Sequence, residues 1–429
     1  MLLEYGAPYP RQATMHVRPQ VEALLPDLIS WRRRFHQYPE LGFLEEQTSA
    51  FVIQQLQLLG WQVRTGVAKT GVVATLEGGQ PGKVLAIRAD MDALPIQELN
   101  KISYASTRPG VMHACGHDGH TAIALGVAKY LAEHREALKG TVKLLFQPAE
   151  ESPGGALPMI QEGALKNPEV DAVIGLHLWN NLPLGTAGIQ AGPIMANADQ
   201  FKLKIQGRGG HGAMPHQTVD AVVVASHVVT ALQTIVSRNV NPFESAVVTV
   251  GKLNAGSAFN IIAQEATLEG TVRSFSPELA DLLPQRIEAV VANICKAFGA
   301  AYEFEYIRHY PAVINHPLIT QWIQGVAAGV LGNVAQVVLE RTMGGEDMAY
   351  FLKEAPGCYF FLGSANTDKG LDKPHHHPCF DFDERALALG VEIFVRCTEE
   401  FQELAIPSLN EISEEVVFSP ISGQAGCSI

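Results

Sequence analysis

Several apolar, strand-like segments of this chain end in side chains that can bind a metal ion, and this feature constrains the fold most. Asp90 and Asp92 follow the run VLAI, and His177 follows AVIGL. Glu150 and Glu151 come just after KLLF, and a histidine tract at 375–377 comes shortly after CYFFLGSA. In open α/β sheets, sites form beyond the carboxyl ends of the strands. The pattern therefore predicts an α/β fold whose strands deliver their polar ends to one site.

Strand-like and helical segments alternate along most of the chain, but the rhythm changes in the middle. A length of 429 residues favours two domains. Within 197–310 the expected order is β-α-β-β-α-β, which is typical of a ferredoxin-like α+β domain. We expect this domain to interrupt a catalytic domain, made of 15–196 and 311–405, with a mixed, largely parallel sheet flanked by helices. The tail, 406–429, has no apolar period and is predicted to be mostly disordered.

Composition excludes several classes of function. A net charge of −13 argues against a nucleic-acid surface, which needs a basic stripe. The six cysteines are scattered without framework spacing, which favours reduced thiols and a cytoplasmic location. The N-terminus lacks the pattern of a signal peptide. The longest apolar stretch, 221–236, carries polar residues and is short for a membrane span, so we expect a buried helix and no membrane.

The segment HACGHDGH carries the most specific chemistry in the chain. It places His113, Cys115, His117 and His120 within eight positions, upstream of the Glu150–Glu151 pair. Thiolate, imidazole and carboxylate together suit a transition metal, above all tetrahedral Zn²⁺. A further carboxylate beside such an ion can act as a general base on water. The segment therefore indicates metal-assisted hydrolysis.

Each part of this pattern has a simpler interpretation. Cys115 could be a buried thiol near a capping histidine, and Glu150–Glu151 a solvated pair before a turn. His177 could be a core histidine with satisfied hydrogen bonds, and the 375–377 tract adventitious. We favour the metal site because unpaired carboxylates are costly to bury after an apolar strand.

The inserted domain contributes three further candidates. His211 lies in the glycine-rich segment GRGGHGAMPH, and Asn260 and Arg273 flank the second hairpin strand. Arginine is suited to two-point recognition of a carboxylate. A surface salt bridge is the alternative for Arg273.

Eight motifs occur in an order that resembles one family. They closely resemble the dinuclear metallo-amidohydrolases that include hippurate hydrolase, N-acyl-amino-acid amidohydrolases and plant auxin-conjugate hydrolases, which have a zinc-exopeptidase-like fold. The likeness runs from about Leu28 to Leu404. The motifs are RADMDALP, HACGHDGHT, QPAEE, GLH, GGHGAMPH, GTVR, GGEDMAYF and HHPCFDFDE.

The resemblance implies two divalent ions in each subunit, Zn²⁺ or Mn²⁺, with Co²⁺ or Ni²⁺ as further candidates. Cys115 matches the thiolate that bridges them. His117 and Glu151 would complete the ligands of one ion, and His177 and His376 those of the other. Glu150 matches the general base.

The resemblance also implies roles around the ions. Asp92 and Asp118 would orient ligands, and His211 would reach the active site of the other subunit in a homodimer to stabilise the oxyanion. Asn260 and Arg273 would hold the free carboxylate of the substrate. The chain departs from the family at Ala263, Met348 and an additional histidine, His375, none of which removes a ligand or the base.

The implied activity is hydrolysis of N-acyl amino acids, hippurate-like or with acetyl or aryl-acyl groups, to a carboxylic acid and an amino acid. The alternatives are a dipeptidase or carboxypeptidase on the same scaffold and a metal-binding protein without catalysis. Retention of Glu150 argues against the last, because a purely structural site requires no base.

Overall fold

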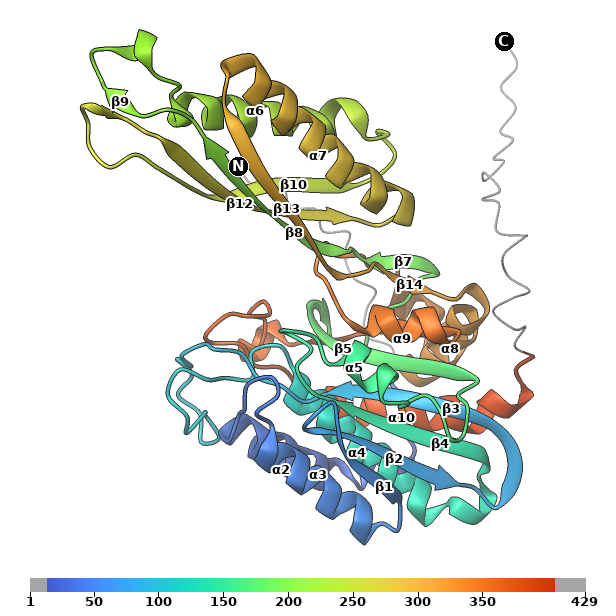
Figure 1. The fold of residues 1–429 in the computed structure, drawn as a ribbon. Helices are drawn as coiled ribbons and strands as arrows, with labels where there is room; N and C mark the ends of the chain where they lie inside the picture. The colour runs from blue at the N-terminus through green and yellow to red at the C-terminus, as the bar shows by residue number, and fades with distance from the viewer. Residues whose placement is uncertain (1–13, 406–429) are drawn as a thin grey trace, which may run out of the picture.

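The computed structural model describes residues 14–405 (Figure 1). The tail predicted to be disordered lies outside these residues. The described chain forms a larger α/β part and a smaller part that lies above it in Figure 1 and is joined to it by two crossing segments.

An eight-stranded sheet forms the centre of the larger part. Its order is β1-β2-β4-β3-β5-β16-β6-β15, and the inner strands β4, β3, β5 and β16 are parallel. These inner strands are buried on both faces, as their continuous apolar runs require. The strands are β1 (Gln62–Val67), β2 (Gly71–Glu77), β3 (Gln80–Asp90), β4 (Lys139–Gln147), β5 (Ala172–Pro183), β6 (Ala187–Gly188), β15 (Val337–Val338) and β16 (Gly357–Ala365).

Helices cover both faces of this sheet, so the predicted α/β fold class is confirmed. One face packs against α1 (Pro19–Glu22), α2 (Leu25–Gln37), α3 (Glu46–Leu58), α4 (His117–Glu133), α8 (Pro317–Leu331) and α10 (Arg385–Glu400). The other face packs against α5 (Ala156–Gln161) and α9 (Met348–Glu354). Two short strands, β7 (Gly192–Met195) and β14 (Val313–Asn315), pair near the crossing segments.

The smaller part has the β-α-β-β-α-β order that the sequence predicts. Its antiparallel sheet runs β10-β12-β8-β13, with α6 and α7 on one face and a core of its own. The Ser276 hydroxyl accepts from the Leu279 amide at the start of α7, and Gly299 ends that helix with a φ of 71°. The elements are β8 (Ala198–Gln206), α6 (Ala221–Asn239), β10 (Ala246–Ala255), β12 (Glu265–Ser274), α7 (Pro277–Phe298) and β13 (Ala301–Tyr310).

Helix α6 is long and apolar enough, by length and composition alone, to cross a membrane. Only one third of its most apolar window is buried. The buried side chains form one stripe, Val224, Val228, Leu232 and Ile235, and belong to the core of the smaller part. The helix therefore has the amphipathic burial of a helix in a folded domain.

A two-strand arm extends from the smaller part, on the left in Figure 1. It consists of β9 (Gly210–His211), β11 (Ile261–Ile262) and the loops beside them. Ile261 pairs with His211 in an antiparallel register. The sequence did not predict this pairing, because two-residue strands carry no periodic signal.

Candidate metal centre and active-site cleft

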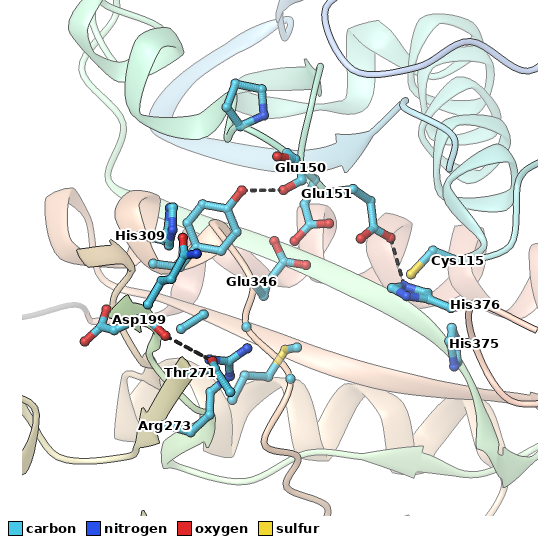
Figure 2. Close-up of a pocket in the computed structure, with 18 of the residues that line it drawn as sticks. Cys115, Glu150, Glu151, Asp199, Thr271, Arg273, His309, Glu346, His375 and His376 are labelled. Atoms are coloured by element: carbon cyan, nitrogen blue, oxygen red, sulfur yellow. Dashed lines mark hydrogen bonds and ion pairs between the residues drawn. The ribbon is translucent and has the colours of Figure 1, made fainter. Parts of the chain in front are cut away.

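Polar side chains carried by three strands or the loops after them, and by the start of one helix, meet in a cleft between the two parts of the molecule. Glu150 and Glu151 follow β4, His177 lies on β5 and His376 follows β16. Cys115 precedes α4, whose first residue is His117. Gly116 makes the turn between them with a φ of 93°, which favours glycine. Figure 2 shows Glu150, Glu151, Cys115 and His376 facing the same space.

Cys115 and His177 are spaced like two ligands of one ion. The Cys115 Sγ lies 3.5 Å from the His177 Nε2. A thiolate at about 2.3 Å and an imidazole nitrogen at about 2.1 Å from a tetrahedral zinc ion are about 3.6 Å apart. The His177 Nδ1 donates to the Leu178 carbonyl at 2.7 Å, so its Nε2 carries the free lone pair.

His117 is oriented in the same way. Its Nδ1 donates to the Asp92 carbonyl at 3.0 Å, which leaves Nε2 as the nitrogen that can bind an ion. That Nε2 is buried without a hydrogen-bond partner among the described residues. A buried nitrogen without a partner is costly, and a metal ion would satisfy it.

Glu151 and His376 form the second pair of ligand atoms. The His376 Nε2 lies 3.0 Å from the Glu151 Oε1, and that buried oxygen has no hydrogen bond among the described residues. His376 has a φ of 64°, an uncommon conformation for a residue with a side chain. The two side chains therefore converge on one point, where a bound ion would take the place of their direct contact.

These contacts define two groups that share the thiol. Cys115, His117 and His177 form one group of mutually close ligand atoms, and Cys115, Glu151 and His376 form another. The side chains therefore fit two ions bridged by Cys115. The predicted division put His117 and Glu151 on one ion, and the ligand atoms of these two residues do lie close together. The contacts at 3.0 and 3.5 Å instead pair His376 with Glu151 and His177 with Cys115.

The electrostatics of the site also favour a bound cation. Burial, followed by the charges of Glu151 and Glu150, raises the pKa of the Cys115 thiol well above its usual range. Burial opposes protonation of His117, yet the Asp90 and Asp92 carboxylates raise its pKa to about 10. Such a centre keeps its protons unless bound divalent ions replace them.

Glu150 occupies the position of a general base. Its pKa is raised by burial and then by the neighbouring carboxylates of Glu346, Glu151 and Asp347. Its Oε2 lies 4.0 Å from the His117 Nε2, and Tyr310 donates to its backbone carbonyl at 2.7 Å. A carboxylate with raised proton affinity next to the ligand atoms can accept a proton from water.

The two aspartates expected to orient ligands differ. Asp92 accepts from the amides of Glu150 at 2.9 Å and Glu151 at 3.0 Å, so it sets the turn that carries both. Among residues 14–405, the Asp118 carboxylate is bonded to the Arg32 and His36 side chains and to the next amide in the chain. Its contacts support the packing of α2 against α4 and do not support the predicted contact with a ligand.

Sequence reasoning did not assign a role to a buried network behind the site. Arg88 lies among the carboxylates of Asp90, Glu346 and Asp347 at 2.7–3.0 Å. Asp90 in turn binds the Nδ1 of His120 at 2.6 Å, so His120 is part of this network and not a free donor. The segments RADMD and GGED contain these residues. Their concentration of charged residues was the signal in the sequence that could have pointed to this network.

The cleft has a volume of about 850 Å³ and is lined by both parts of the chain. Arg273, on β12, enters it opposite the metal centre (Figure 2). Its Nη1 donates to a hydroxyl and two carbonyls, and no carboxylate forms an ion pair with it among residues 14–405. Burial lowers its pKa. This guanidinium can therefore hold an anionic group.

His211 and Asn260 do not line this cleft. Both are exposed and lie on the arm formed by β9 and β11. Within one chain, the structure therefore brings together the five predicted ligands, the base and Arg273, but not these two residues.

The comparisons agree with this centre. A model of the peptidase family M20/M25/M40 matches residues 86–400. An N-acyl-L-amino acid amidohydrolase of Geobacillus stearothermophilus is 50% identical over 297 residues, 69% of this chain and 80% of that protein. An N-acetyl-L-cysteine deacetylase of Bacillus subtilis is 44% identical over 367 residues, 86% of each chain.

A solved structure resembles the whole described fold. It is a dinuclear metal-binding peptidase of the M20 family from Bacillus subtilis, with a TM-score of 0.78 and 36% sequence identity. The alignment covers 89% of this chain and 99% of that one. Fold and site thus define a hydrolase with two divalent ions in one cleft. The chain belongs to peptidase family M20/M25/M40, as the motifs predicted.

Proposed function

We propose that this chain hydrolyses the amide bond of N-acyl amino acids to a carboxylic acid and a free amino acid. One observation carries the proposal: Arg273, a cation without a carboxylate partner among residues 14–405, faces Glu150 and the ligand atoms across the cleft. A substrate with a free carboxylate next to its amide fits that arrangement. The names of relatives that act on N-acyl amino acids and N-acetylcysteine support it.

In the proposed reaction, Arg273 binds the substrate carboxylate and places the amide carbon near Glu150. The bound ions supply Lewis-acid chemistry, lowering the pKa of water and polarising the acyl carbonyl. Glu150 takes a proton from the attacking water and later gives it to the leaving nitrogen. Zn²⁺ is the ion that the thiolate, imidazole and carboxylate set fits best.

We further propose that the active unit is a homodimer, in which the arm of one subunit reaches the cleft of the other. His211 and Asn260 are exposed and remote from their own cleft, and the arm also exposes apolar residues such as Phe259 and Ile261. In such a dimer His211 would stabilise the oxyanion, and Asn260 would contact the substrate carboxylate. A cytoplasmic location is proposed because the five cysteines among the described residues are all free.

Hydrolysis of dipeptides or longer peptides is the second candidate, because the solved relative is named a peptidase. The test is a substrate panel of hippurate, N-acetyl amino acids, dipeptides and carboxypeptidase substrates, with and without a chelator. The Glu150→Gln variant controls for contaminating activity. Higher kcat/KM on peptides than on N-acyl amino acids would replace our proposal with the peptidase.

A further inference from the structure

We propose that His375 is a positioning residue for the metal centre. Through the Leu178 carbonyl, it ties the loop that carries His376 to the strand that carries His177. The histidine therefore maintains the ligand geometry of the ion shared by Cys115, Glu151 and His376, without binding that ion. This inference rests on the ligand assignment above.

The backbone of Leu178 binds three histidines. Its amide donates to the His120 Nε2 at 2.8 Å. Its carbonyl lies 2.7 Å from the His177 Nδ1 and 2.9 Å from the His375 Nε2. A carbonyl only accepts, so both of these nitrogens carry hydrogen. The Leu178 carbonyl thus orients two rings: that of His177, a ligand, and that of His375, the neighbour of the ligand His376.

Aromatic neighbours hold the ring of His375 in this orientation. It stacks on Trp179 with a centroid distance of 4.6 Å and an interplanar angle of 28°. The ring centroids of Phe380 and His177 each lie 5.0 Å from that of His375, and the His177 pair is T-shaped. With Nε2 bonded to a carbonyl, His375 is not one of the side chains whose ligand atoms gather with Cys115.

The bond of His375 to Leu178 lies directly beside His376, whose own conformation is unusual. Its side chain is 52% exposed, and its backbone has the uncommon φ of 64°. A strained conformation persists only when the surrounding contacts determine it. Its own amide donates to the Ala114 carbonyl at 2.8 Å, and the residue before it is held by Leu178.

The two ions should therefore depend differently on His375. Without it, His177 keeps its own bond to the Leu178 carbonyl, and Cys115 and His117 are unaffected. The loop that carries His376 loses the bond next to that ligand, while Asn180 still donates to the Lys373 carbonyl and the Leu99 amide to the Pro378 carbonyl. The ion at Glu151 and His376 should weaken while the other stays bound.

The test measures metal binding and not turnover. Metal-free wild-type protein, His375→Leu and His375→Gln are titrated with Zn²⁺ in competition with a chromophoric chelator. Glutamine has an N–H group that can donate to the Leu178 carbonyl, whereas leucine has a similar size but no hydrogen-bond donor. The matched control is His377→Leu, since His377 is in the same tract but accepts from the Cys379 amide and does not contact Leu178.

Wild-type protein should bind two Zn²⁺. His375→Leu should weaken the second by about 10- to 100-fold, the usual effect of removing a group that orients a ligand. His375→Gln and His377→Leu should stay close to wild type, and thermal unfolding of the metal-free proteins should not differ. Unchanged affinities in His375→Leu, or equal losses in His377→Leu, would overturn the role of His375. A wild-type protein that bound one Zn²⁺ would overturn the ligand assignment itself.

Discussion

The Cys115 Sγ lies 3.5 Å from the His177 Nε2, although 62 residues separate them in the chain. The first precedes a helix and the second lies on a buried strand, so only the fold brings them together. Their spacing matches two ligands of one ion. The predictions below follow from that arrangement.

Replacing Glu150 or Glu151 with glutamine should show which of the two is the base and which is a metal ligand. Glu150→Gln should keep both metal ions and lose roughly 10²- to 10⁴-fold in kcat, the range for a proton-transfer group. Glu151→Gln should lose metal, because its Oε1 is one of the ligand atoms beside His376. Metal analysis and steady-state kinetics check both, and the reverse pattern would exchange the two roles.

Cys115 should act as a ligand and never as a nucleophile. Burial, and then the charges of Glu151 and Glu150, raise the pKa of its thiol and keep it unreactive without a cation. No acyl group should form on it, since two ions already activate water. Intact-protein mass spectrometry during turnover should show unmodified chain, and an acylated Cys115 would end the proposed mechanism.

Arg273 should recognise the substrate carboxylate. Arg273→Gln should raise KM for N-acyl amino acids about 10- to 100-fold, the loss expected for a charge-assisted hydrogen bond. Substrates with a carboxamide in place of the carboxylate should be much less affected. Lys252→Gln is the matched control, because Lys252 lines the same cleft but is already paired with Glu269 at 2.7 Å. Equal losses on both kinds of substrate would contradict carboxylate recognition.

Two inactive chains should complement each other if His211 acts across a dimer. Mixing His211→Ala with Glu150→Gln under subunit exchange creates sites that have both wild-type groups. About a quarter of all sites should recover under equal random mixing in a two-fold dimer. Activity is assayed beside a native mass measurement of heterodimers. Heterodimers without activity, or a fully active monomer, would contradict the proposal that His211 acts in the active site of the other subunit.

Asp118 should stabilise the fold at neutral pH. The Arg32 guanidinium and His36 hold the pKa of this buried carboxyl well below its usual range, against the effect of burial. Its stabilisation is therefore complete above the unfolded-state pKa of about 4 and is lost as pH falls towards the folded-state pKa. Asp118→Asn should lower the free energy of unfolding by about 3–5 kcal/mol at pH 7, because Arg32 stays buried without this partner.

Urea unfolding of metal-free wild type and Asp118→Asn at several pH values checks the predicted direction of this pH dependence. The difference between them should grow from pH 7 to about pH 5, as His36 gains its proton beside Asp118, and shrink below about pH 4. A difference that does not shrink below about pH 4 would show that the ionised carboxyl is not the stabilising group.

Sequence alone predicted the α/β class, which the structure confirms, and proposed Cys115 and His177 as ligands and Glu150 as the base, whose side chains the structure brings into one cleft. These depend on short-range features, namely apolar runs followed at once by polar residues at strand ends, and on motifs of fixed spacing. The order of strands and helices in the inserted part could also be predicted, because apolar residues recur with a clear period in long amphipathic helices and strands.

Only the tertiary structure decided which ligands belong together and which neighbours support them. His376 lies against Glu151 because a backbone with positive φ turns it there, and Asp118 lies beside Arg32 because α2 packs on α4. Arg88 gathers carboxylates from positions as distant as Asp347. Side-chain direction and contacts between distant segments are properties of the packed chain, and no local pattern of residues records them.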